Sequence, residues 1–188
     1  MTDNTIFSIR WYLVGAIATA IWLLLAWDHF HGGVPNHHLL AREDLPAVSN
    51  WWGGILVPIL TWFLLYRIQK RMSVDNANNS HPLTNHSDIL YGFFGALLFG
   101  VALSLFFTFE NEDMPFYMLM ALFVLALFRP VYRAECFLGF LLGMTYTFGG
   151  VLPIGIRGIL VLVCAILYLL IRPAILFVFK RIVSIKQK

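Results

Sequence analysis

The sequence is dominated by six apolar segments that are almost free of charged side chains. A helix needs about 20 mostly apolar residues to cross a bilayer, and only helices or closed barrels satisfy the backbone polar groups in lipid. The segments lack the alternating pattern of barrel strands. We therefore predict an all-α integral membrane protein, a six-helix transmembrane bundle forming one polytopic domain over residues 1–188. The predicted spans lie approximately at residues 9–28, 51–70, 89–109, 114–130, 134–150 and 152–172.

Composition excludes most other classes of protein. Of the 188 residues, 60% are hydrophobic and only 12% are charged, whereas soluble domains carry about 25% charged residues. This balance rules out a soluble globule and an intrinsically disordered chain. The two cysteines, Cys136 and Cys164, fall inside predicted spans at a separation that matches no metal or redox motif. We expect both to be packing residues.

Positively charged residues set the expected orientation, because cytoplasmic loops are enriched in Lys and Arg. With the N-terminus inside, only Arg42 and Arg157 of the 13 Lys and Arg residues lie in outer segments. We therefore predict that both termini are cytoplasmic and that the protein resides in a bacterial inner (plasma) membrane. Residues 71–88 are polar and rich in Asn, and we expect them to form a flexible cytoplasmic loop.

The predicted extracytoplasmic loop between the first and second spans contains four of the six histidines. If the first helix continues for one turn past the bilayer, Asp28 and His31 share a face. Asn36 is placed to cap a short helix that carries His37 and His38. A carboxylate with imidazoles is the ligand set that zinc or another divalent metal favours. The predicted metal ligands are therefore Asp28, His31, His37 and His38. The alternative is an interfacial loop whose polar edges face headgroups and water.

Two further residues complete the predicted catalytic site. Glu110 begins an acidic turn after the third span and is a candidate general base for a metal-bound water. Arg157 lies about one turn inside the last span, where a charge is costly unless it is paired. We expect its side chain to face inward toward Glu110 or Asp28, beneath the first outer loop, and to bind an anion or oxyanion. The last helix would then end near Arg172; the alternative places residues 158–179 in the membrane.

Small residues one helical turn apart allow close helix packing. Ala16 and Ala20 have this spacing on the first span, and Gly139 and Gly143 have it on the fifth. In size, six-span topology and the small residues on the first span, the chain resembles the substrate-binding subunits of energy-coupling-factor vitamin importers. The resemblance covers the whole chain as architecture only, and it implies a binding component of a larger transporter.

The chain also contains the residue types of alkaline ceramidase-type membrane hydrolases, which hold zinc with Ser, Asp and His. It lacks the HxxxH pair that this family carries on its last helix. We therefore assign the chain to neither family.

These features favour three functions. The first is a membrane-embedded, divalent-metal-dependent hydrolase whose outward-facing site acts on a lipid or lipid-linked substrate. The second is a small-solute binding or transport subunit in which the first outer loop forms a lid. The third is a non-catalytic membrane scaffold or assembly factor. The expected partners are the lipid bilayer, a lipid or small-molecule ligand, and a second copy or other subunits of a membrane complex, with no nucleic acid.

Overall fold

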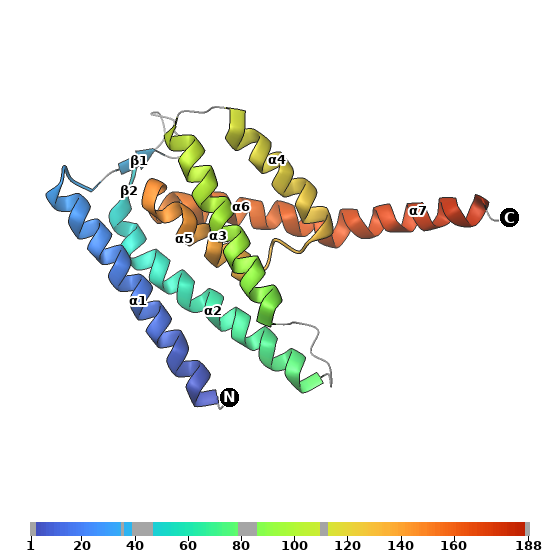
Figure 1. The fold of residues 1–188 in the computed structure, drawn as a ribbon, viewed down its shortest axis with the longest axis horizontal. Helices are drawn as coiled ribbons and strands as arrows, with labels where there is room; N and C mark the ends of the chain where they lie inside the picture. The colour runs from blue at the N-terminus through green and yellow to red at the C-terminus, as the bar shows by residue number, and fades with distance from the viewer. Residues whose placement is uncertain (1–2, 35, 39–46, 79–85, 110–112, 187–188) are drawn as a thin grey trace.

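The computed structural model describes residues 3–34, 36–38, 47–78, 86–109 and 113–186. Helices make up most of this part of the chain (Figure 1): α1 (Asp3–Phe30), α2 (Gly53–Asn78), α3 (His86–Thr108), α4 (Asp113–Phe128), α5 (Ala134–Phe148), α6 (Val151–Ile166) and α7 (Arg172–Lys186). A π-helical turn, η3 (Leu167–Ile171), joins α6 to α7, and a 3-10 turn, η2 (Asn50–Trp52), precedes α2.

Four helical stretches are long and apolar enough to cross a membrane: Ser8–Phe30, Asn50–Val74, His86–Thr108 and Val151–Val178. The helices α4 and α5 are apolar too, but they are shorter, with 16 and 15 residues. The outside of the bundle carries many exposed Trp, Leu, Ile and Phe side chains, a surface suited to lipid rather than water. The predicted helical membrane fold is confirmed to this extent, while six crossings and their orientation stay predictions.

The helices α3 and α5 pack closely through glycines. A Cβ atom at Gly139 would overlap the carbonyl oxygen of Phe93, and one at Gly143 would lie 2.5 Å from the carbonyl oxygen of Leu97. Only a residue without a side chain allows the two backbones to come this close. The predicted close approach at Gly139 and Gly143 is therefore confirmed.

The other small-residue pair does not pack in this way. Ala16 and Ala20 are both exposed. The helix α1 instead packs against α2 and its neighbours through larger side chains, including Ile21, Leu25 and Val57. The face of α1 that carries the alanines is thus turned away from the described part of the bundle.

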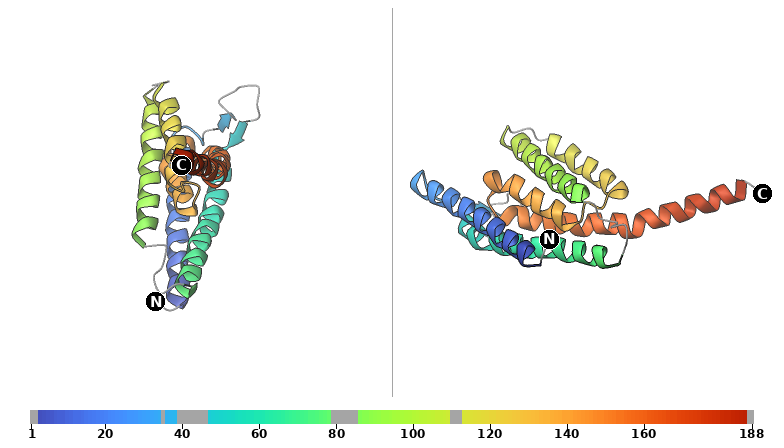
Figure 2. Two further views of the ribbon diagram at one scale, coloured as in Figure 1. Left: turned by 90° about the vertical axis from the view of Figure 1, so that its right-hand side faces the viewer. Right: turned by 60° about the horizontal axis from the view of Figure 1, so that its bottom comes forward.

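The last helix runs through α6, η3 and α7 without a break. Figure 2 shows it nearly end-on in the view in which α1, α2 and α3 stand upright, and α7 extends away from the other helices. Its apolar part, Val151–Val178, has 28 residues, about 42 Å of helix, which exceeds the ~30 Å hydrocarbon thickness. A helix of this length tilts or extends beyond the bilayer. We predicted from the sequence that the last helix ends near Arg172. This prediction is wrong, because the helix continues through α7 to Lys186.

The segment between α1 and α2 contains a small antiparallel ribbon. Strand β1 (Asn36–His38) pairs with β2 (Ala47–Ser49), with His37 opposite Val48. The predicted short helix at His37 and His38 is therefore wrong, because the backbone there pairs with a distant segment rather than with itself. The predicted loop at residues 71–88 is also shorter than expected, since α2 continues to Asn78 and α3 begins at His86. Residues 79–85 lie outside the described part of the chain.

Candidate functional site

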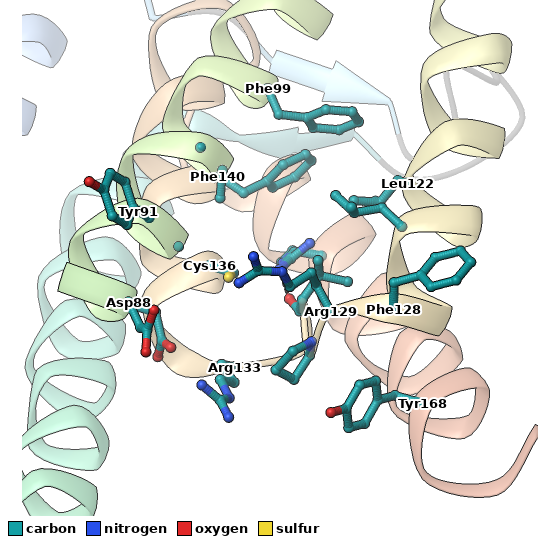
Figure 3. A pocket seen from close by; sticks show the side chains of 18 residues that line it. Asp88, Tyr91, Phe99, Leu122, Phe128, Arg129, Arg133, Cys136, Phe140 and Tyr168 are labelled. Carbon is teal, nitrogen blue, oxygen red and sulfur yellow. Dashed lines mark hydrogen bonds between the residues drawn. The ribbon is translucent and has the colours of Figure 1, made fainter. Parts of the chain in front are cut away.

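A cavity of about 710 Å³ lies between α3, α4, α5 and the last helix. Figure 3 places Asp88 and Tyr91 of α3 on one side and Leu122 and Phe128 of α4 on the other, with α5 between them. The cavity has an apolar wall and a charged end. The apolar wall includes Ala96, Phe99, Leu122, Leu125, Phe128 and Phe140. The charged end includes Asp88, Arg129, Arg133, Glu135 and Arg157.

Arg157 lines this cavity although the residue is only 2% exposed. One terminal nitrogen, Nη2, donates a hydrogen bond of 2.6 Å to the carbonyl oxygen of Val131. The guanidinium lies over the Phe140 ring, 5.2 Å from its centroid, and farther from Phe137 at 6.0 Å. The Nε atom is buried, and no described residue forms a hydrogen bond with it. Among the described residues, no carboxylate forms an ion pair with Arg157.

The helical period of α6 explains why this arginine is buried. Its buried residues are Pro153, Arg157, Leu160 and Cys164, and their spacing of three and four places them on one face. That face packs against the interior, so Arg157 follows Leu160 and Cys164 inward. Sequence reasoning predicted the inward direction but not the neighbours.

The described hydrogen bond of Arg157 reaches the connection between α4 and α5. It is accepted by Val131, which follows the C-terminal end of α4. Among the described residues, Asp28 forms no ion pair with Arg157. Glu110 lies outside the described residues, so its approach to Arg157 stays a prediction.

An ion pair with one buried partner, Glu135, lies at the edge of the cavity. Nη2 of Arg71 on α2 donates to Oε1 of Glu135 on α5 at 3.0 Å, and the Glu135 side chain is only 2% exposed. The other carboxylate oxygen, Oε2, and Nε of Arg71 are buried and have no hydrogen-bond partner in the described part of the chain. Gly92 of α3 leaves room for this carboxylate, since a Cβ atom there would lie 3.0 Å from Glu135 Cγ. Sequence reasoning missed this pair; the one available signal was an acid at the start of an apolar helix.

The predicted metal ligands are not gathered at this cavity. The His31 ring stacks on Trp27 with centroids 3.8 Å apart, and its Nδ1 lies 2.9 Å from the Trp27 carbonyl oxygen. The ring of His29 meets Trp51 edge-on. Within the described ranges, no three His, Cys, Asp or Glu side chains come together as a metal site. The side chains of His37 and His38 lie outside what the structure describes, so a metal bound by Asp28, His31, His37 and His38 stays a prediction.

If the metal hypothesis is correct, the purified protein contains bound metal. It should carry one equivalent of zinc or another divalent ion, and Asp28→Ala and His31→Ala should both lose it, because removing a ligand weakens the whole coordination sphere. Elemental analysis after purification without chelators measures this, with Asp88→Ala as a control outside the predicted set. Protein without stoichiometric metal would end the hydrolase hypothesis in its metal-dependent form.

No protein-family model, curated protein or solved structure matches this chain. The function is therefore inferred from the cavity and its charged residues alone.

Proposed function

We propose that this chain is a membrane-embedded binding protein for an anionic small molecule, held in the cavity at Arg157. This is the binding or transport class among the functions that the sequence favours. The observation that supports it is a guanidinium that is 2% exposed, lines the cavity and pairs with no described carboxylate. A buried charge without a counter-ion costs several kcal/mol, and within a membrane such residues typically mark ligand or ion pathways.

The chemistry of arginine indicates what kind of ligand fits. A guanidinium is planar and permanently charged, and its donors match the two oxygens of a carboxylate or phosphate. Charge-assisted hydrogen bonds of this kind are roughly twice as strong as neutral ones. Nη2 of Arg157 already donates to Val131, which fixes the orientation of the guanidinium. Nε is buried, so Nη1 is the donor that remains for a ligand.

The other charged residues that line the cavity also favour a negatively charged ligand. Arg129 and Arg133 also line the cavity, together with the carboxylates Asp88 and Glu135. Since Arg71 pairs with Glu135, the cavity keeps an excess of positive charge. A charged cleft of this kind attracts anions and raises their local concentration.

In this proposal the binding site is the cavity at Arg157 rather than the first outer loop. The charged end lies at the α4–α5 connection, and residues 129–133 belong to the positively charged segments that predict the cytoplasmic side. We therefore place access to the site on that side, and the first outer loop has no part as its lid.

Anion binding is tested by the melting temperature of detergent-purified protein with inorganic phosphate, decanoate and lysophosphatidate. At a concentration of 100 Kd, a ligand that binds only the folded state stabilises it by about 2.7 kcal/mol, so at least one anion should raise Tm. The variant Arg157→Gln should lose this response. Without ligand its Tm should equal or exceed that of the wild type, because an unpaired buried charge is gone.

The matched control is Arg10→Gln. Arg10 is also buried, at 6% exposed, but it contacts Gln69 and the rings of Trp62 and Tyr66 on α2, away from the cavity. This variant should keep the full ligand response even if its Tm falls. An equal rise in wild type and Arg157→Gln, or no rise with any of the anions, would contradict the proposal.

A further inference from the structure

We infer that the ligand is an amphiphile, with an anionic headgroup at Arg157 and a long apolar chain that lies between α3 and α4. The inference rests on the proposed function, because the headgroup is the anion that Arg157 binds. The inference adds two points to the proposed function. The ligand has a long apolar chain, and it enters the cavity from the bilayer between α3 and α4.

The apolar wall of the cavity continues to the lipid-facing surface. Leu122 lies at its interior, only 6% exposed, whereas Leu125 and Phe128 of the same helix are 48% and 70% exposed. These three residues follow one another along α4 with spacings of three, so they form a continuous apolar strip. The strip therefore joins the interior of the cavity to the lipid-facing surface of α4.

The opposite wall, on α3, is open because side chains are missing there. Three small residues of α3 line the cavity: Gly92, and then Gly95 and Ala96, which follow it by three and four residues. This spacing places them on one face of α3. A Cβ atom at Gly95 would meet no other atom within 4 Å. Gly92 serves a different purpose, because it makes room for Glu135. The groove along α3 is therefore open at Gly95.

Small residues alone do not define a site, but this groove leads to a buried charge. Arg157 lines the same cavity, and its buried Nε has no hydrogen-bond partner among the described residues. The charged end of the cavity includes Arg129 and Arg133, which lie in and beside the connection between α4 and α5.

This arrangement has the polarity of a lipid in a bilayer. The charged end lies at the ends of α4 and of α5, where a headgroup would be at the membrane surface, and the apolar groove extends toward the middle of the helices. A volume of about 710 Å³ falls in the range of about 300–1,000 Å³ that is typical of cavities for one small ligand. The shared chemistry is an anionic headgroup on one long chain, which a free fatty acid and a lysophospholipid both provide.

The test compares ligands that share a headgroup but differ in the chain. Binding of lysophosphatidate is measured against glycerol 3-phosphate, and binding of decanoate against acetate, by native mass spectrometry and equilibrium dialysis with the full-length protein. Monoolein supplies the chain without the charge. We expect the two chain-bearing anions to bind in an Arg157-dependent way, at least about tenfold more tightly than their short counterparts, since two buried methylenes suffice for that factor.

A variant that fills the groove gives an independent readout. Gly95→Leu should weaken binding of the chain-bearing anions by about tenfold or more, while leaving the weaker binding of glycerol 3-phosphate unchanged. The matched control is Gly15→Leu on α1, where a Cβ atom likewise meets nothing within 4 Å and no cavity residue is involved. If Gly95→Leu does not fold, the comparison of chain lengths in the wild type still decides the question.

The outcomes separate this inference from the proposed function. If short and long anions bind equally well and both require Arg157, the amphiphile inference is wrong and the anion-binding function stands. If no anion of either length binds in an Arg157-dependent way, both are wrong. Preference for lysophosphatidate over decanoate, or the reverse, supports the inference and identifies the headgroup as phosphate or carboxylate.

Discussion

Replacing Gly139 with leucine should abolish the folded, monodisperse protein. A Cβ atom at this position would overlap the Phe93 carbonyl oxygen and lie 3.0 Å from the Leu97 nitrogen, so α3 would have to move away as a backbone. Backbone atoms of a helix cannot rotate aside as a flexible side chain does. We expect a loss of more than about 3 kcal/mol, at or beyond the upper end of the usual range for overpacked cores. Size-exclusion chromatography and thermal unfolding in detergent measure it.

The control for this prediction is a glycine in open space. A Cβ atom at Gly15 or Gly158 would meet no other atom within 4 Å, so leucine at either position should change stability by no more than about 0.5 kcal/mol. Gly139→Ala should already be damaging, because the first added carbon causes the overlap. Normal folding of Gly139→Leu would show that α3 and α5 do not pack as described.

The two small-residue pairs show what the sequence could and could not predict. Gly139 and Gly143 have the spacing that permits close packing, and the backbone of α3 packs against both. Ala16 and Ala20 have the same spacing, yet both are exposed. The spacing identifies a face that another helix can approach, but it does not say whether one does. That choice depends on how all the helices of the bundle pack together.

Only part of the candidate site could be predicted, because the site too depends on how the helices pack together. The cost of a charge in an apolar segment indicated that Arg157 turns inward, and the structure shows it buried. Hydropathy locates segments along the chain but not their tilt, so the oblique direction of the last helix could not be foreseen. In the structure, Arg157 donates a hydrogen bond to the carbonyl oxygen of Val131, a contact that hydropathy does not predict. The pairing of β1 with β2 was missed for a different reason, since each strand has only three residues and so carries little pattern in the sequence.

The Arg71–Glu135 pair should respond asymmetrically to the loss of either partner. The Glu135 side chain is 2% exposed and that of Arg71 is 28% exposed. Arg71→Met leaves a carboxylate buried without a counter-ion, a change that typically costs about 3–5 kcal/mol. Glu135→Gln leaves an arginine that can still reach solvent, and glutamine can keep one hydrogen bond to it. We therefore expect Glu135→Gln to cost less than half as much as Arg71→Met.

A double variant distinguishes an ion pair from two independent packing residues. In Arg71→Met/Glu135→Met, neither charge remains, and replacement of a buried pair by apolar residues is often neutral or stabilising. The double variant should therefore be more stable than Arg71→Met alone, with an interaction energy above about 1 kcal/mol in a double-mutant cycle. Thermal unfolding of the wild type, Arg71→Met, Glu135→Met and the double variant in one detergent gives this value. Additive losses would mean that the contact at 3.0 Å does not join α2 to α5 energetically, and that the two helices are held together by their apolar side chains alone.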